Sequence, residues 1–102
     1  GSIKFEKLDE IKGEAELGYF LRKDFWGKGL MTEAVKEVVY LSFEKFQLKE
    51  IRVITHVENT GSQRVALKAG FRLFRQFKGS ERYTRKMRDY YDFRIGRGDF
   101  YE

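Results

Sequence analysis

Two glycines separate a strand-like run from a helix-like run in the stretch Trp26-Gly27-Lys28-Gly29-Leu30-Met31-Thr32-Glu33-Ala34. Gly27 and Gly29 permit turn conformations and leave no side chain between the backbone amides and a ligand. The helix expected to follow points its unpaired N–H groups and the positive end of its dipole back at that turn. Helix N-termini of this kind bind phosphate or pyrophosphate. The stretch therefore predicts an anion-binding turn, to which Lys28 adds positive charge.

The elements around this turn follow the order β-β-α-β-α-β-β. Hydrophobic alternation and β-branched runs predict strands at Ile3–Leu8, Ala15–Leu21, Ile51–Val57, 71–78 and 87–95. Apolar residues at helical spacing predict a helix that starts near Thr32, whose side chain is expected to cap it, and runs to about Gln47. A second helix is predicted to open at Asn59 and to stop at Gly70.

A strand, a helix and another strand form a right-handed crossover, so the strands at 15–21 and 51–57 should be parallel. Ligands bind such units beyond the C-terminal ends of the strands, which is where the glycine turn lies. The expected fold class is α/β, an α+β arrangement on a mixed sheet. The whole chain, residues 1–102, is expected to form one domain.

The composition excludes several classes of protein. With 41% apolar and 17% aromatic residues, the chain should fold rather than stay disordered. No run of 18 apolar residues exists, so no membrane-spanning segment is expected. Cysteine is absent, which removes disulfides, thiolate catalysis and cysteine-based metal sites and fits a cytoplasmic location. No metal site is expected.

The net charge of +5 lies mostly in the C-terminal third. Residues 72–102 carry 9 Lys and Arg against 5 Asp and Glu, interleaved with Tyr and Phe. One interpretation is a patch for nucleic acid or another anionic ligand. The other, which we favour, is a strand hairpin with a solvated charged face. An anionic cofactor would suit the basic balance equally well.

Several spaced segments resemble the GNAT N-acetyltransferases. They are Ala15–Leu21, Trp26–Gly29 with Thr32–Ala34, Glu58–Val65 and Lys68–Phe71. The branch that the chain most resembles contains the ribosomal-protein serine/alanine N-acetyltransferases. The resemblance implies an enzyme that uses acetyl-CoA to acetylate a primary amine, such as a protein N-terminus, a polyamine or another small amine.

The resemblance also implies which residues contact the cofactor. The superfamily's pyrophosphate loop has Gln or Arg, two free positions, Gly, one free position and then Gly or Ala; Trp26, Gly29 and Met31 occupy those places here, so the first and last depart from the pattern. Backbone amides from Gly27 to Thr32 would bind the phosphates, the end of the second strand would pair with the pantetheine arm, and the second helix would approach the cofactor. The implied cofactor-binding residues are Phe20, Leu21, Trp26, Gly27, Lys28, Gly29, Leu30, Met31, Thr32, Asn59 and Ser62.

The implied reaction is direct attack of an amine on a thioester, which needs a base for the amine proton and an acid for the thiolate. Glu81, ten residues after Phe71, resembles the carboxylate that works through a water in the ribosomal-protein branch. Ser62 resembles the acid of that branch. Other members use a Tyr four to five residues before the Gly-Phe pair, where this chain has the apolar stretch 65–67.

Each of these residues also has a purely structural interpretation. Glu81 stands in a polar run, where a solvated loop carboxylate is common. Ser62 could serve only to cap the second helix. His56, the only histidine, is expected to be a strand residue without a catalytic role.

The family's opening strand and the two helices after it have no counterpart in this sequence. In the family those helices form much of the acceptor side and cover one face of the sheet. Their absence should expose apolar surface or a strand edge, so we expect a homodimer, with exchanged elements as a variant. The alternative function is a non-catalytic module whose basic aromatic segment, Arg82–Arg97, binds RNA; nucleic acid is not the favoured partner.

Overall fold

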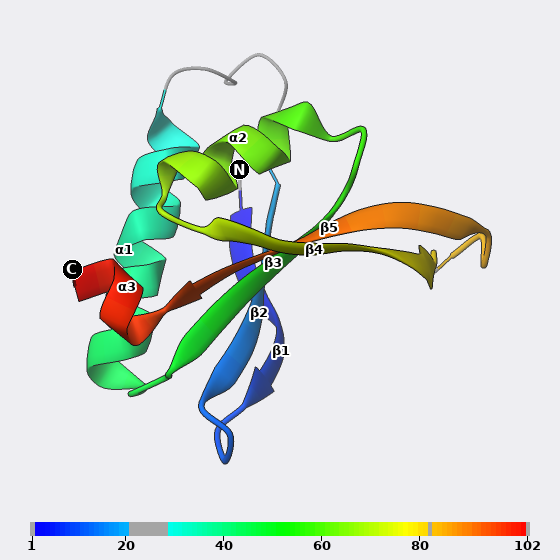
Figure 1. The fold of residues 1–102 in the computed structure, drawn as a ribbon. Coiled ribbons are helices and arrows are strands. Elements are labelled where there is room, and N and C mark those ends of the chain that lie inside the picture. The colour runs from blue at the N-terminus through cyan, green and yellow to red at the C-terminus, as the bar shows by residue number, and fades with distance from the viewer. Residues whose placement is uncertain (1, 21–28, 82, 102) are drawn as a thin grey trace.

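The predicted order of elements is confirmed in the computed structural model, which describes residues 2–20, 29–81 and 83–101 (Figure 1). The strands are β1 (Ser2–Asp9), β2 (Glu14–Phe20), β3 (Glu50–His56), β4 (Arg72–Ser80) and β5 (Met87–Gly96). The helices are α1 (Leu30–Lys45), α2 (Thr60–Lys68) and a short α3 (Arg97–Tyr101) that the periodicity did not predict. No helix in these described ranges is long and apolar enough to cross a membrane.

The strands form one mixed sheet in the order β1-β2-β3-β5-β4. β2 and β3 are parallel, which confirms the predicted crossover, and the other neighbours are antiparallel. The parallel pairing joins only Glu14–Glu16 to Glu50–Arg52. β2 continues to Phe20 and β3 to His56, so the two strands separate toward their C-terminal ends.

The core lies between one face of the sheet and the helices. Alternate residues of the central strands, such as Leu17, Ile51 and Phe93, pack with the apolar face of α1. α1 and α2 lie on the same side of the sheet, and the outer half of the β4–β5 hairpin reaches past the other strands (Figure 1). The opposite face of the sheet carries no helix from the described part of the chain.

The predicted capping role of Thr32 is wrong. α1 begins at Leu30, two residues earlier than the sequence indicated, and its N-cap is Gly29 in a left-handed conformation with φ 75°. Thr32 lies in the first turn with only 8% of its surface exposed. Its side chain packs into the core, and α1 has no side-chain hydrogen bond at its cap among the described residues.

The predicted end of α2 is confirmed. Gly70 has φ 101°, a conformation that favours glycine. The Phe71 amide donates to the Ala66 carbonyl at 3.0 Å and the Gly70 amide to the Leu67 carbonyl at 3.1 Å. This pair of hydrogen bonds is the Schellman motif, and it turns the chain into β4.

One buried polar residue was not predicted. Asp92 of β5 is completely buried, although it stands on the polar side of the strand's alternation. Arg75 donates to its Oδ2 at 3.1 Å, and Arg94 donates to both carboxylate oxygens at 3.2 and 3.0 Å. The Arg94 guanidinium also lies 3.8 Å from the centre of the Phe74 ring. These arginines cover the carboxylate on the face of the sheet that lacks helices.

Candidate functional site

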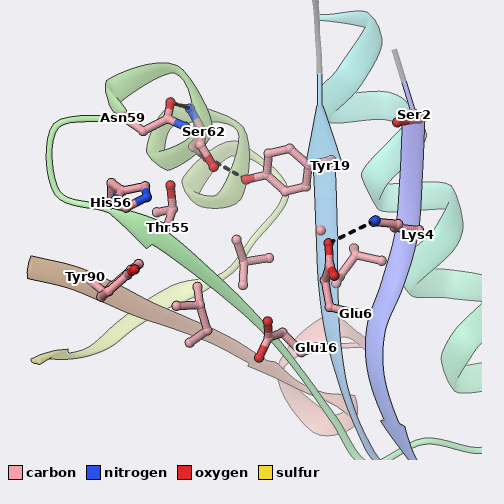
Figure 2. Close-up of a pocket in the computed structure, with 14 residues that line it drawn as sticks. Ser2, Lys4, Glu6, Glu16, Tyr19, Thr55, His56, Asn59, Ser62 and Tyr90 are labelled. Carbon is pink, nitrogen blue, oxygen red and sulfur yellow. Dashed lines mark hydrogen bonds and ion pairs between the residues drawn. The ribbon is translucent and has the colours of Figure 1, made fainter. Parts of the chain in front are cut away.

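A cavity of about 520 Å³ lies where β2 and β3 separate (Figure 2). This volume is in the range of small-molecule sites. Strands β1, β2, β3 and β5 and the start of α2 form its wall. The polar residues of the wall are Ser2, Lys4, Glu6, Glu16, Tyr19, Thr55, His56, Asn59, Ser62 and Tyr90.

The first turn of α2 brings two predicted site residues, Asn59 and Ser62, to this wall. The Asn59 side chain accepts a hydrogen bond from the Ser62 amide at 3.1 Å, which confirms Asn59 as the N-cap. Gln63, which the sequence did not single out, donates through Nε2 to the carbonyls of Val57 at 2.7 Å and His56 at 3.3 Å. These hydrogen bonds connect the start of α2 to the end of β3.

Tyr19 fastens the same turn to β2. Its hydroxyl donates to the Ser62 carbonyl at 2.5 Å, and the two residues face each other across the cavity wall (Figure 2). Burial raises the pKa of Tyr19 above its ordinary value, and hydrogen bonds from the Ser62 side chain and the Ala66 backbone oppose part of that rise. Alternate residues of β2 face the core, and Tyr19 lies on this face with Ala15 and Leu17. This alternation is the sequence signal that could have indicated that the Tyr19 side chain points inward.

The N-terminus of α1 presents the backbone donors that the glycine turn predicted. The Glu33 amide makes the first helical hydrogen bond, to the Gly29 carbonyl at 3.1 Å. The amides of Leu30, Met31 and Thr32 precede that bond, and within the described ranges no acceptor for them is found. Among the described residues, a Cβ at Gly29 would meet nothing within 4 Å.

The side chains at this terminus divide between solvent and core. Leu30 is exposed, whereas the side chains of Met31 and Thr32 are buried, so only the backbone of those two can contact a ligand. Phe20 is the last residue of β2. Beyond Glu16, the edge of β2 that faces β3 has no strand partner among the described residues. Leu21, Trp26, Gly27 and Lys28 lie outside the described residues.

Glu81 lies apart from the cavity wall. It stands just after β4, where its carboxylate accepts a hydrogen bond from the Thr84 hydroxyl at 3.2 Å. Arg88 links it toward the cavity, with Nε 3.9 Å from Glu81 Oε2 and Nη2 2.7 Å from Glu58 Oε1. Glu58 precedes the helix cap Asn59; its pKa is lowered by its own backbone amide and by Arg88.

The wall also contains ionisable groups that the sequence did not indicate as site residues. Glu6 and Glu16 line it, and the Lys4 ammonium lies 3.7 Å from Glu6 (Figure 2). A Cβ at Gly18 would come within 2.5 Å of Glu6 Oε1, so this glycine gives room for the Glu6 side chain. Strand pairing brings these residues together, and no local motif signals it.

His56 lies in the wall as well. Its ring packs against Tyr90 with centroids 4.7 Å apart. Its Nδ1 is buried without a hydrogen-bond partner within the described part of the molecule. The ring is thus held by packing and not by a polar partner.

A parallel strand pair that separates beside a helix N-terminus, whose first amides have no acceptor among the described residues, is an arrangement that suits a long, phosphate-bearing ligand. The family model described as the acetyltransferase (GNAT) domain matches residues 1–72. The chain belongs to the GNAT acetyltransferase family.

The comparison with individual proteins agrees with this assignment. The chain is 30% identical over 95 residues to the uncharacterized N-acetyltransferase p20 of Bacillus licheniformis, covering 93% of this chain and 53% of that protein. It is 28% identical over 71 residues to the ribosomal-protein-serine acetyltransferase of Escherichia coli, covering 70% of this chain and 40% of that protein. The chain thus spans about half the length, or less, of these relatives.

A solved structure shows the same fold. The microcin C7 self-immunity acetyltransferase MccE, in complex with acetyl-CoA and AMP, superimposes with a TM-score of 0.83. The match has 24% sequence identity and covers 92% of this chain and 52% of that chain. The predicted mixed α/β fold is therefore confirmed as a GNAT fold, and GNAT acetyltransferases use acetyl-CoA.

Proposed function

We propose that residues 1–102 form one domain that binds acetyl-CoA and transfers its acetyl group to a primary amine. The observation that supports this most is the separation of β2 from β3 beyond Glu16 and Arg52, next to the first amides of α1, for which the described part of the chain offers no acceptor. A pantetheine arm needs an unpaired strand edge, and a pyrophosphate needs unpaired amides. The chain offers both.

The residues present fit this ligand. In this proposal the amides from Gly27 to Thr32 bind the pyrophosphate, and Gly29 places no side chain beside them. The backbone of Phe20 and Leu21 pairs with the pantetheine arm. Trp26 and Lys28 complete the loop, and Asn59 and Ser62 approach the reactive end from α2. Bound acetyl-CoA supplies an activated acetyl group as a thioester.

The chemical step requires two proton movements. As the amine nitrogen bonds to the acetyl carbon, Glu81 accepts the amine proton through a water. As the carbon–sulfur bond breaks, Ser62 gives a proton to the departing sulfur. The structure sets Ser62 in the cavity wall and Glu81 beside Arg88, so the water path from Glu81 would run along the β5 side of the cavity.

The acceptor in this proposal is a primary amine that arrives as an ammonium ion and releases one proton to solvent before it attacks, and a protein N-terminus is the first candidate. The carboxylates of Glu6 and Glu16 give the cavity negative charge near its β1 side, offset in part by Lys4. Such charge attracts a cation before it loses its proton. The E. coli relative carries a name that includes a ribosomal protein as its acceptor.

Replacing either catalytic candidate is expected to lower kcat while acetyl-CoA binding is kept. We expect Glu81→Gln and Ser62→Ala each to reduce kcat by about 10²-fold, the lower range for general acid–base catalysis. Ser62→Ala keeps the two backbone hydrogen bonds found at Ser62 and removes its hydroxyl, which also interacts with the Tyr19 hydroxyl. Acetyl transfer to a panel of amines, including peptides with Ser or Ala at the N-terminus, measures the effect.

Glu37→Gln, at an exposed position on α1, is the matched control and should keep full activity. Full activity in Glu81→Gln would remove Glu81 as the base. Full activity in Ser62→Ala would remove Ser62 as the acid.

Three arginines of the C-terminal third give RNA binding no support. Arg75 and Arg94 are paired with Asp92, and Arg88 is paired with Glu58. Paired guanidinium groups have fewer donors left for phosphates.

We also propose that the protein is a homodimer in the cytoplasm, with exchange of elements as one form. The edge strand β4 exposes the apolar side chains of Leu73 and Phe74, and Met87 of β5 is exposed near the hairpin turn. Exposed apolar groups on a strand edge favour pairing with another chain. Sedimentation across a concentration series should give twice the 12.2 kDa chain mass. A mass that stays at the monomer at every concentration would contradict the dimer.

A further inference from the structure

The first turn of α2 is held from two sides. Gln63 fastens it to the end of β3 through two backbone carbonyls, and Tyr19 fastens it to β2 through the Ser62 carbonyl. Between these attachments the ladder of β2 and β3 has already ended at Glu16 and Arg52. The turn thus bridges the open end of the separated strands.

The Tyr19 bond is suited to this task. Its oxygen–oxygen distance of 2.5 Å is at the short end for a hydroxyl donor, and its ring packs against the core. The packed ring leaves the hydroxyl little freedom to move. Burial raises the pKa of Tyr19, so the hydroxyl keeps its proton and remains a donor at neutral pH.

We propose that Tyr19 is a positioning residue for acetyl transfer: its hydroxyl holds the first turn of α2 against β2 and so fixes Ser62 at the wall of the cavity. This inference rests on the proposed function, in which Ser62 protonates the leaving sulfur. Tyr19 transfers no proton itself, because its hydroxyl is bonded to a backbone carbonyl.

The effect of losing this hydroxyl follows from the geometry. A proton donor must lie about 2.6–3.2 Å from its target, and a displacement of about 1 Å can cost about 10²-fold in rate. Tyr19→Phe keeps the packed ring and removes the hydroxyl, and with it the bond to the Ser62 carbonyl. We expect kcat to fall about 10-fold, because Gln63 still holds the turn from the β3 side. The affinity for acetyl-CoA should change less than threefold.

The experiment is a double-mutant cycle with a structural readout. It compares the wild type, Tyr19→Phe, Ser62→Ala and the double variant, with Tyr40→Phe on the exposed side of α1 as the matched control. For each protein we would measure kcat, acetyl-CoA affinity by calorimetry, and hydrogen exchange of the amides of Ser62 and Gln63. Both amides are hydrogen-bonded to Asn59 in the intact turn.

Two results together would support the positioning role. Exchange at Ser62 and Gln63 should be faster in Tyr19→Phe and unchanged in Tyr40→Phe. The loss of kcat should be present in the wild-type background and absent in the Ser62→Ala background. Unchanged exchange in Tyr19→Phe, or the same fold-loss of kcat in both backgrounds, would overturn it. Failure of the proposed function would show separately, as a wild type that binds no acetyl-CoA. The exchange rates alone would then test whether Tyr19 holds the first turn of α2.

Discussion

Asp92→Ala is expected to lower the free energy of unfolding by about 3 kcal/mol, because removing one partner of a buried ion pair leaves the other charge uncompensated. The Asp92 carboxylate is completely buried and accepts hydrogen bonds from Arg75 and Arg94. The Arg75 and Arg94 side chains are 52% and 24% exposed, so water can solvate the arginine charges that lose their partner. The expected loss of stability is therefore at the low end of the values for broken buried ion pairs. The hydrogen bond that Arg94 donates to Asp92 is also the largest cause of the raised pKa of Arg94.

Urea unfolding followed by circular dichroism measures this change. Asp89→Ala is the matched control, since Asp89 is the same residue type on the same strand and no side-chain ion pair of it is found in the described ranges. The control should shift stability by less than about 1 kcal/mol. An Asp92→Ala protein as stable as the control would show that the arginines do not depend on this carboxylate.

Gly29→Asp is expected to weaken acetyl-CoA binding by about 100-fold while leaving the fold intact. Gly29 has φ 75°, which Asp tolerates better than most residues, and a carboxylate at a helix N-terminus favours the helix. The same carboxylate would stand at the N-terminus of α1, where a Cβ meets none of the described residues within 4 Å and where we propose that the phosphates bind. Like-charge contact with the phosphates costs several kcal/mol, and each 1.4 kcal/mol is about tenfold in affinity.

The matched control is Gly98→Asp on α3, another glycine whose Cβ would meet nothing within 4 Å. Gly98→Asp should bind acetyl-CoA as the wild type does, by calorimetry at fixed ionic strength. Equal affinities for the two variants would mean that phosphates do not bind at the start of α1.

Local sequence patterns predicted most of the fold because they report local physics. The alternation of the strands, the Asn59 cap and the Gly70 ending each depend on residues within a few positions of one another. The sequence placed the start of α1 at Thr32, two residues late, because a threonine near a helix start looks like a cap. In the structure the Thr32 side chain is buried, and the sequence around it does not show this. A polar residue near a helix start cannot be assigned as cap or core from its own segment.

The site was predicted in part for the same reason. Asn59 and Ser62 lie in one short motif, and the structure places both at the cavity. Tyr19, Glu6 and Glu16 reach the cavity through pairing between strands, which no short motif encodes. Asp92 belongs with Arg75 and Arg94 only after β4 and β5 have paired. The catalytic role of Glu81 stays a prediction that Glu81→Gln decides.

Calorimetric titration of the chain with acetyl-CoA, joined to a thermal melt at each concentration, tests the central claim most directly. We expect saturable heat with a Kd below about 1 mM, the upper range of substrate affinities for enzymes. We also expect a melting temperature that rises with ligand, since a ligand at 100 times its Kd stabilises the fold by about 2.7 kcal/mol. Absence of both heat and thermal shift at millimolar acetyl-CoA would contradict the assignment of the separated strands and the α1 terminus as the cofactor site.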